Sequence, residues 1–456
     1  MGPFRWAEGC FSVRLNAPTR FLLLDACYYG ERGSLQIAGG NSLCTRIEIG
    51  RGWKRYSVDL GAAQTGTLRF ELDKVFPVEE DSRELGLMLR RMECFSCPQR
   101  FRELEAQIRN AELNEGERLA GETTLRSVPP KLRITIEKRC NISPRCVYCE
   151  WDWAKSLEAA NDLDFSLDTL HNLGDFYNHA SEIVDCSYGE PFLNRDLKDL
   201  VDDFDRQAKH FEMTSNAQVM SREKIDMLLG KSVIVYFSLD AANAESYRRY
   251  RNDEFETLVT NVRELCRRKK QHGGRPSVIV SFIAMKSNVR EFPEFIDLVA
   301  DLGADAVKLR SLYHEGAMIK EEVQRAGYAF RYRDEVLDLE TLRDFIVAAR
   351  ETADRKGIPL FVDVDDFQPT ESEGPLCSEP WETLYLLNRG IMPCCFGKKP
   401  LATLDGVAPG ELGSFVAETF NGPAYRELRK GLAAGELPRY CRETKSCPIV
   451  KKVMGA

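Results

Sequence analysis

The sequence lacks several features that mark secreted, membrane or nucleic-acid-binding proteins. No stretch approaches the roughly 18 apolar residues of a membrane span, and the N-terminal MGPFRWAEGC has no apolar core of signal-peptide length. Lys and Arg number 63 against 71 Asp and Glu, a net charge of -8, which provides no basic surface for nucleic acid. We therefore expect a cytoplasmic protein with no membrane span and no nucleic-acid partner.

Histidine is also scarce, with five residues in 456 and none paired at zinc-finger spacing. Cysteine, in contrast, is abundant, with 15 residues. In a small secreted chain these would suggest disulfides, but in a long chain without an export signal they favour metal ligation. Cys94 and Cys97 form an isolated Cys-x-x-Cys that we interpret as structural. Five other cysteines stand singly in strand-like or helical segments and are predicted to be buried thiols: Cys10, Cys27, Cys44, Cys186 and Cys266.

The N-terminal part is predicted to be a small β domain. At 456 residues the chain exceeds one hydrophobic core, so two or three domains are expected. From residue 11 to about 92, short alternating runs separated by Gly, Asn and Arg-Gly turns predict an antiparallel β-sandwich, assigned to 1–95. Apolar residues then follow at helical spacing and end before Pro129-Pro130, which predicts a helical linker over 96–130.

The central part alternates strand-like and helical runs, which predicts an α/β fold with a parallel sheet or barrel over 131–330. A barrel of this kind has its active site at the carboxyl ends of the strands. After Leu312 we read an irregular, charged stretch, then a connecting helix and strand over 331–373, and a cysteine-rich extension over 374–456. The six predicted strand runs are 131–139, 182–189, 210–216, 232–240, 277–285 and 304–312.

Three cysteines are crowded into RCNISPRCVYCEW at the end of the first of these runs: Cys140, Cys146 and Cys149. Thiolates suit soft iron, and three of them can hold one iron-sulfur cluster. No fourth ligand follows nearby, so one iron would stay open to a small molecule. A structural zinc site with a distant fourth ligand is the alternative.

This loop resembles that of the radical S-adenosylmethionine (SAM) superfamily, where it follows the first strand of a partial (β/α)6 TIM-like barrel. The family usually places three residues in the first gap, whereas this chain has five, Asn141 to Arg145. Tyr148 keeps the aromatic residue before the last cysteine. The resemblance implies that Cys140, Cys146 and Cys149 are the catalytic ligands of a [4Fe-4S] cluster. Supplied with an electron by a flavodoxin- or ferredoxin-type reductant, the cluster would cleave SAM to a 5′-deoxyadenosyl radical.

Other strand ends resemble the same family. Ser187 to Pro191 is similar to its Gly-Gly-Glu-Pro segment, in which glycine permits close backbone approach and Glu190 supplies a carboxylate for the SAM ammonium. Thr214-Ser215-Asn216 resembles a Thr-Asn-Gly, although Ala217 follows where loose backbone is expected. The resemblance implies the following SAM-binding residues: Tyr148, Gly189, Glu190, Ser215, Asn216, Ser238 and Arg251. On the sixth strand, Lys308 and Arg310 are either substrate contacts or simply the strand end.

The C-terminal extension resembles the SPASM/twitch region of radical SAM proteins, with its Cys-x-x-Pro-Trp start, a Gly and a Pro-Cys-Cys. Four separated thiolates can hold an auxiliary [4Fe-4S] cluster, and zinc is the alternative. The resemblance does not decide between the adjacent Cys394 and Cys395. The candidate ligands are Cys377, Cys394, Cys395, Cys441 and Cys447.

The substrate is predicted from the two flanking regions. VFPVEEDSRELGLMLRRM and RGIMPCCFG resemble segments of polysaccharide and glycosylation enzymes, which implies a sugar, nucleotide-sugar or glycan-related substrate. A peptide or protein is the second hypothesis, because SPASM enzymes commonly modify peptides. A third is a non-catalytic iron-sulfur scaffold that binds glycan. Cys186 is either the donor of a hydrogen atom to the substrate, which a redox-neutral epimerisation would need, or a core residue.

Overall fold

The computed structural model describes residues 5–454, except for 8, 41, 79–80, 86, 97, 150–164, 313–321, 364–373, 388–389, 398 and 445–446. The chain divides into two compact units, Met1–Asn110 and Ala111–Ala456. The division falls inside helix α1 (Pro98–Leu119), in the segment expected to be a helical linker. Trp151, Trp153, Cys97 and His314 lie outside the described residues.

The first unit is antiparallel, as predicted, but its strands are longer than expected. The sequence suggested short strands about ten residues apart, whereas β3 and β4 have 21 and 23 residues and form one long hairpin. The turn-like glycines inside these strands bend the hairpin instead of ending it. The six strands of the sheet follow the order β1-β8-β3-β5-β2 with β4 on β3, and β6 pairs with β7. The strands are β1 (Arg5–Ala7), β2 (Cys10–Arg14), β3 (Thr19–Gly39), β4 (Ser42–Gln64), β5 (Thr67–Leu72), β6 (Phe76–Val78), β7 (Asp81–Leu85) and β8 (Leu87–Phe95).

The core of this unit draws on both halves of β3. The β3–β4 register shifts between Tyr28 and Arg32, where the hairpin has a bulge. Leu22 and Leu24 before the bulge and Leu35 after it are buried in the same apolar cluster. The two halves therefore cover one core, as in a folded-over sheet.

The second unit contains a nine-stranded sheet in the order β17-β14-β13-β12-β11-β10-β9-β18-β19. From β9 to β14 each strand is parallel to the next one along the chain, which confirms the predicted α/β class. Each of the six predicted runs contains one of these strands, although β9 stops well before residue 139. The strands are β9 (Lys131–Ile134), β10 (Glu182–Asp185), β11 (His210–Ser215), β12 (Val233–Ser238), β13 (Ser277–Ala284), β14 (Ala306–Ser311), β17 (Leu360–Asp363), β18 (Thr383–Leu387) and β19 (Gly390–Met392).

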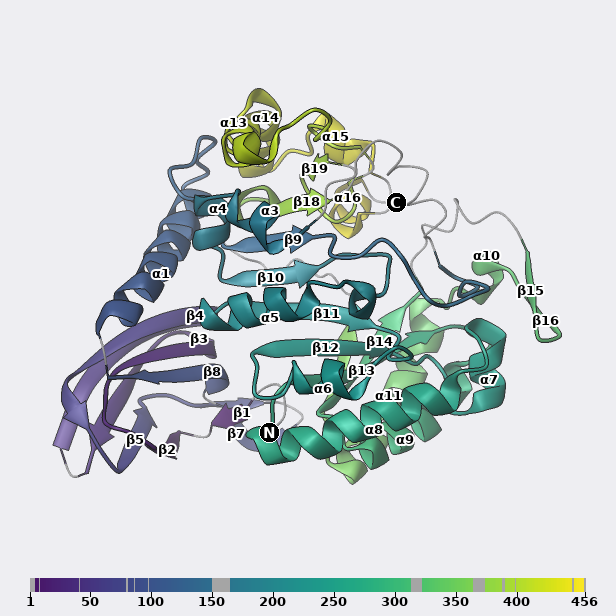
Figure 1. The fold of residues 1–456 in the computed structure, drawn as a ribbon, viewed down its shortest axis with the longest axis horizontal. Helices are drawn as coiled ribbons and strands as arrows, with labels where there is room; N and C mark the ends of the chain where they lie inside the picture. Colours follow the sequence, from purple (N-terminus) through teal and green to yellow (C-terminus); the bar gives the residue numbers. More distant parts are fainter. Residues whose placement is uncertain are drawn as a thin grey trace. The chain divides into compact units, whose positions relative to one another are not determined.

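Helices cover one face of this sheet (Figure 1). Val233, Val235 and Phe237 of β12 are buried in the large core that the strands share with the helices, so alternate residues such as Tyr236 and Ser238 face the other way. The helices of this unit beyond α1 are α3 (Leu167–His171), α4 (Asp175–Asn178), α5 (Leu197–Arg206), α6 (Arg222–Asp226), α7 (Ala244–Tyr250), α8 (Phe255–Lys269), α9 (Phe292–Leu302), α10 (Tyr332–Glu335), α11 (Leu339–Lys356), α12 (Glu379–Glu382), α13 (Leu412–Phe420), α14 (Pro423–Ala433), α15 (Arg439–Arg442) and α16 (Pro448–Met454). No helix of the described residues is long and apolar enough to cross a membrane.

Two features of this unit were not anticipated. The stretch after Leu312, expected to be irregular, contains a hairpin of β15 (Val323–Arg325) and β16 (Tyr328–Phe330). The start of the cysteine-rich region joins the main sheet, because β18 pairs in parallel with β9 and β19 pairs with β18. The first cysteine-rich strands therefore extend the sheet that carries the cluster loop.

The single cysteines are less buried than predicted. Only Cys266 is buried, on α8, while Cys27, Cys44 and Cys186 are partly buried. Cys10 is exposed because it begins β2 on the face that points away from the core. The small, apolar side chain of cysteine did not by itself indicate whether each thiol lies on the buried or the exposed face of its strand or helix.

Candidate functional site

A cavity of about 380 Å³ lies at the carboxyl ends of the parallel strands. All three cysteines of the cluster loop and all seven residues expected to bind SAM line it. They come from the loop after β9, from the ends of β10, β11 and β12, and from the residue after α7. The described residues that line it are Cys140, Ile142, Cys146, Tyr148, Cys149, Ser187, Tyr188, Gly189, Glu190, Thr214, Ser215, Asn216, Ser238, Arg251, Ile283, Arg310, Ser311, Leu312 and Tyr332.

The cysteine loop is held by its apolar residues and its backbone. Val147 and Tyr148 are buried in a small cluster with Tyr250 and Phe330. The Val147 amide donates to the Tyr250 carbonyl at 2.9 Å, and the Cys149 amide donates to the Cys146 carbonyl at 3.0 Å. Because neighbouring side chains anchor the loop, its three partly buried cysteines can line the cavity.

The longer first gap of the loop has its own contacts. The side-chain amide of Asn216, at the end of β11, donates to the Asn141 side chain at 2.9 Å. Asn141 in turn donates to Gln218 at 3.1 Å. The departure from the usual spacing therefore adds a hydrogen-bonded link to a neighbouring strand end.

Two nitrogen donors approach the loop sulfurs. Nη1 of Arg251 lies 3.6 Å from Sγ of Cys146, and Nδ2 of Asn216 lies 3.8 Å from Sγ of Cys140. Burial raises the pKa of the Cys146 thiol, an effect that the Arg251 charge opposes. Donors beside a sulfur favour the thiolate, the form that binds iron. The cysteines and their neighbours thus fit an iron-sulfur cluster.

Among the described residues, no three His, Cys, Asp or Glu side chains form a group that could hold a metal ion. A single metal ion needs ligands that converge on one point, and this finding concerns such sites. In a cubane cluster each thiolate binds a different iron, so the sulfurs stand further apart than the ligands of a single ion.

Arg251 and Asp240 form a buried ion pair behind the loop. The guanidinium donates to Oδ2 of Asp240 at 3.0 and 2.6 Å, and the side chains are 7% and 1% exposed. The Tyr148 hydroxyl donates to the same oxygen at 2.6 Å. Burial alone would lower the pKa of Arg251, but Tyr148, Cys146 and Asp240 raise it well above its ordinary value. Arg251 therefore stays charged and joins the loop to the end of β12.

The partner of Arg251 was missed in the sequence. Arg251 was expected to bind SAM, which stays a prediction; in the structure its side chain donates to Asp240 and to Cys146. Asp240 follows Ser-Leu at the strand end and adopts a φ of 60°, in the left-handed region that Asp tolerates better than most residues. A carboxylate at a strand end next to an arginine-rich helix was the available signal.

Glu190 also links strand ends. It is 1% exposed, and its carboxylate accepts from the amides of Phe192 at 3.1 Å and Asn216 at 2.7 Å and from the Ser215 hydroxyl at 2.8 Å. Burial raises its pKa to about 7, although these donors oppose the shift. The carboxylate joins the segment after β10 to the end of β11. Its expected contact with the SAM ammonium stays a prediction.

The backbone at Gly189 and at Ala217 has the geometry that a glycine usually provides. A Cβ on Gly189 would lie 2.2 Å from the Glu137 carbonyl oxygen, so the close approach that requires glycine is to the chain's own backbone. Ala217 adopts a φ of 58°, which a glycine would adopt without steric cost. The chain therefore keeps the left-handed geometry expected after Asn216 even without a glycine.

The C-terminal cysteines lie outside this cavity. Burial raises the pKa of Cys377 and Cys394, and neighbouring cysteines raise both further. Burial raises the pKa of Cys441 to about 11, with a further contribution from Cys447. Cys395 has a different environment: burial and then Glu379 raise its pKa to about 12, while Tyr385 and Arg133 oppose the shift.

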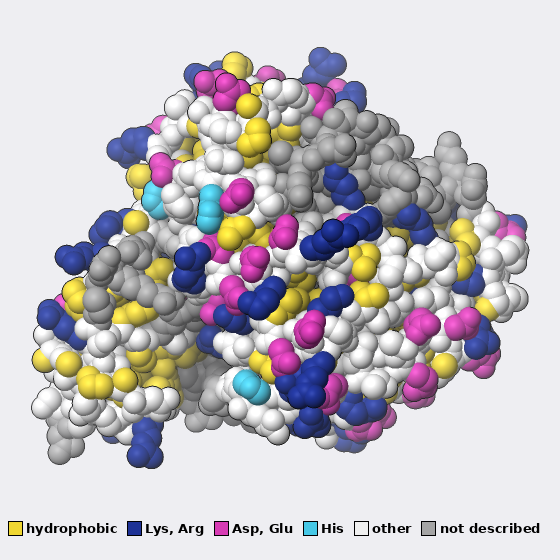
Figure 2. Space-filling model, viewed as in Figure 1, with side chains coloured by type: hydrophobic (Ala, Val, Ile, Leu, Met, Phe, Trp, Pro, Cys, Tyr) yellow, Lys and Arg dark blue, Asp and Glu magenta, His cyan; other side chains and the backbone are white. Residues whose placement is uncertain are grey.

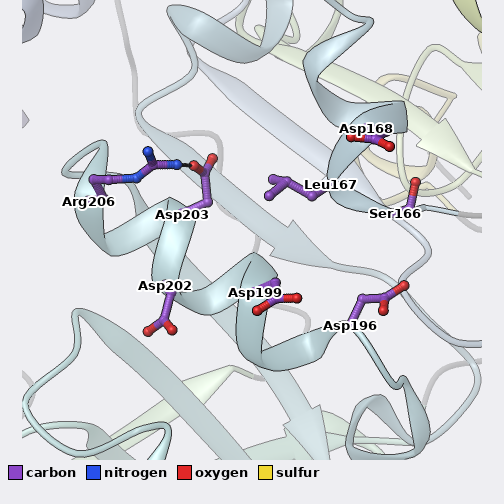
Figure 3. Close-up of a pocket in the computed structure, with 8 residues that line it drawn as sticks. All are labelled: Ser166, Leu167, Asp168, Asp196, Asp199, Asp202, Asp203 and Arg206. Carbon is purple, nitrogen blue, oxygen red and sulfur yellow. Dashed lines mark ion pairs between the residues drawn. The ribbon is translucent and has the colours of Figure 1, made fainter.

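A second hollow, of about 530 Å³, is lined mainly by aspartates of α3 and α5. Figure 3 shows Arg206 turned toward Asp203 while the other acidic side chains are spread along the helices. Asp203 is buried and also accepts from Tyr177 and Gln207. No residue predicted for the functional site lines this hollow. Figure 2 shows Lys and Arg interspersed with Asp and Glu on the face it displays.

No protein-family model matches the chain. The probable GTP 3′,8-cyclase of Methanocaldococcus jannaschii is 25% identical over 182 residues, covering 38% of this chain and 56% of that protein. The tungsten-containing aldehyde ferredoxin oxidoreductase cofactor-modifying protein of Pyrococcus furiosus is 24% identical over 184 residues, covering 40% and 51%. This chain thus spans about half the length of these curated relatives.

Solved structures also resemble the chain. Streptococcus suis SuiB bound to its precursor peptide SuiA has a TM-score of 0.49 and 16% identity, covering 75% of this chain and 74% of SuiB. The anSMEcpe protein with bound AdoMet and the Cp18Cys peptide has a TM-score of 0.41 and 14% identity, covering 71% and 96%. Neither of the two curated relatives is named for a glycan or polysaccharide, and the expected sugar or glycan substrate finds no support.

Proposed function

We propose that this chain, a radical SAM enzyme, cleaves SAM reductively and abstracts a hydrogen atom from a peptide or protein substrate. The observation that carries this proposal is the shared cavity. Cluster cysteines and family-like residues spread from Cys140 to Arg251 in the sequence line one pocket at the strand ends. Residues this far apart line one pocket only if the strand ends converge on it.

The cofactors are a [4Fe-4S] cluster and SAM, and we assign the cluster to Cys140, Cys146 and Cys149. When bound, they supply a one-electron cleavage of SAM to methionine and a 5′-deoxyadenosyl radical, which removes the hydrogen atom. A flavodoxin- or ferredoxin-type protein is the proposed electron donor. The protein contributes binding, orientation and redox tuning.

The surrounding residues have distinct tasks in this proposal. Arg251, paired with Asp240, holds Cys146 and provides a positive charge beside the anionic cluster. Asn216 holds Cys140 through a neutral amide donor and adds no charge. Glu190 provides the negative charge that an ammonium group of SAM would neutralise. Because burial disfavours the charged carboxylate, a cationic partner would stabilise it.

We propose Cys377, Cys394, Cys441 and Cys447 as ligands of an auxiliary [4Fe-4S] cluster. Beyond the effect of burial, Cys441 and Cys447 raise the pKa of Cys377, and Cys377 and Cys441 raise that of Cys394, as expected for groups that share a site. Cys395 differs in that Tyr385 and Arg133 oppose its pKa shift, and the cysteine that acts on it is Cys186 rather than Cys377 or Cys441. This environment supports Cys394 over Cys395 as the ligand.

For the substrate class we adopt the second hypothesis of the sequence analysis. The resemblance of residues 374–456 to the SPASM region supports a peptide or protein, and no relative supports a sugar. A non-catalytic iron-sulfur scaffold would share the cysteines but would not cleave SAM, so the first experiment separates the two.

The test is anaerobic reconstitution with iron and sulfide, reduction with dithionite and addition of SAM. We expect the wild type to form 5′-deoxyadenosine. The Cys140→Ala/Cys146→Ala/Cys149→Ala variant should form none while keeping about half of the iron, because the auxiliary cluster remains.

The matched control replaces three cysteines of the first unit, Cys10, Cys44 and Cys94, with alanine. It should retain both the iron and the product. If the wild type binds a full complement of iron and forms no 5′-deoxyadenosine, the enzyme proposal is wrong and the scaffold replaces it.

A further inference from the structure

The β15–β16 hairpin lies against the cluster-binding loop. Its turn residues, Ala326 and Gly327, have φ values of 48° and 74°, the positive values of a type I′ turn. Arg325 and Tyr328 form the pair that closes the turn. This geometry fixes the direction of the half-buried Arg325 side chain.

The Arg325 guanidinium connects two segments on either side of the site. Nη2 donates to the carbonyl of Arg145, which directly precedes Cys146 in the loop. Nη1 donates to the carbonyl of Arg251 and, at 3.4 Å, to that of Tyr250. One side chain therefore joins the backbone next to a cluster cysteine to the backbone of the arginine that contacts the same cysteine.

The aromatic residues of the hairpin reinforce this contact. The ring of Tyr328 packs edge-on against Tyr250 at 5.9 Å, and Phe330 packs against Tyr148 at 6.3 Å. Both partners, Tyr148 and Tyr250, belong to the buried cluster that holds the loop.

The hairpin is also fixed from its far side. The Tyr328 hydroxyl donates to Glu335 of α10, and Glu335 accepts from the Ser287 hydroxyl at 2.6 Å and the Ser287 amide at 2.9 Å. The hairpin is thus attached to the body of the unit by contacts that do not involve the loop. Because these hydrogen bonds fix the hairpin, the hairpin can restrain the cluster-binding loop.

A guanidinium suits this task better than an ammonium. Its planar fork directs several N–H donors to fixed positions, so one group can reach carbonyls on two segments. Among the described residues its acceptors are backbone carbonyls, which do not neutralise its positive charge as a carboxylate would. That charge lies near the site of an anionic iron-sulfur cluster, where it stabilises the reduced, more negative state.

We propose that Arg325 is a positioning residue: it clamps the loop that carries Cys146 onto the Arg251 segment and makes the cluster there easier to reduce. The proposal rests on the function proposed above, because it requires a cluster at Cys140, Cys146 and Cys149. It extends that function to a hairpin that no motif of the sequence indicated.

The test compares Arg325→Gln, Arg325→Lys and Arg331→Gln in the reconstituted full-length protein. Arg331 directly follows the hairpin and pairs with Glu322 at the surface, so it controls for the loss of an arginine there. The readouts are retained iron and the change that SAM causes in the electron paramagnetic resonance signal of the dithionite-reduced protein. A potentiometric titration of that SAM-responsive signal, in which dithionite supplies one electron to the cluster, gives its reduction potential.

Arg325→Gln should lose about half or more of the SAM-responsive signal, because the loop loses its fork of donors, and the remainder should titrate at a more negative potential. Arg325→Lys keeps the charge, so it should lose signal but hold the wild-type potential. Arg331→Gln should match the wild type. If Arg325→Gln fails to fold, as judged by circular dichroism, the lysine variant still tests the clamp.

Three results would overturn the inference. If Arg325→Gln has the same SAM-responsive signal and the same reduction potential as the wild type, Arg325 neither clamps the loop nor affects the reduction of the cluster. An equal loss of signal in Arg331→Gln would show that the hairpin as a whole, not Arg325, is responsible. A wild type with no SAM-responsive signal would overturn the proposed function, and this inference with it.

Discussion

The two cysteine regions of this chain differ in what surrounds their sulfurs. At the cluster loop, side chains of the protein approach the thiols: Arg251 contacts Cys146, and Asn216 contacts Cys140. In the C-terminal region, burial raises the pKa of Cys377 and Cys441, and other cysteines of the region raise both further. Side chains of the fold surround the first set of thiols, whereas the metal that we propose would hold the second, partly buried set together as thiolates.

This difference leads to the largest effect that we expect. The Cys441→Ala/Cys447→Ala variant should lose about half of the iron and on the order of 5 kcal/mol of stability in the second unit, because metal binding contributes folding energy. The SAM-responsive cluster should remain detectable. Iron analysis and urea unfolding of the reconstituted protein provide the measurement.

A matched double variant, Cys10→Ala/Cys94→Ala, removes two exposed thiols and should change neither quantity. Unchanged iron content and stability in the Cys441→Ala/Cys447→Ala variant would show that the proposed auxiliary site is wrong. Zinc in place of iron in the wild type would keep the metal site but change its identity.

The second prediction weakens the protein scaffold of the cluster loop. Asp240→Asn keeps a residue that tolerates positive φ but leaves the buried Arg251 without its carboxylate. Breaking a buried ion pair from one side costs about 3–5 kcal/mol, so we expect about 4 kcal/mol less stability and weaker iron retention. Urea unfolding and iron analysis after desalting measure the two effects.

Asp253 offers the comparison for this variant. It pairs with Arg248 at the surface, so Asp253→Asn should cost under about 0.5 kcal/mol. An Asp240→Asn protein as stable as that control would mean that Arg251 does not depend on Asp240.

The third and smallest effect is pH-dependent and concerns Glu190. Burial raises its pKa from 4.5 to about 7, so between these values the native state holds a proton that the unfolded state has released. The stabilising contribution is complete below pH 4.5 and is lost as the pH rises through about 7, a change on the order of 3 kcal/mol. Glu190→Gln should remove that part of the pH dependence in unfolding of the metal-free protein.

Asp185, whose pKa burial raises to about 6, should leave some dependence of the same sign in the variant. Glu427→Gln, on an exposed position of α14, should leave the whole profile unchanged. A wild-type profile that rises with pH across this interval would show that the Glu190 carboxylate is stabilised, not penalised, by its surroundings.

The cavity lining was predictable to a large extent because it consists of local motifs. Cys140 and Glu190 stand just after strand-like runs and Ser238 stands near the end of one, and parallel strands place such positions at one edge. Asp240 was not recognised, because its importance comes from Arg251 and Tyr148, which reach it from other segments. The long hairpin of β3 and β4 was also missed, since glycines that look like turns lie within its strands.

The sequence by itself determined the α/β class of the second unit, the antiparallel character of the first, and part of the cavity lining, namely the cluster cysteines and the strand-end motifs. These follow from periodicity and from motifs whose parts are close in the chain. Only the tertiary structure decided that β18 joins β9, that Glu190 bridges two strand ends, and that Arg325 reaches the backbone beside Cys146. Such contacts join residues far apart in the chain, and their energy depends on burial and direction, which no local pattern encodes.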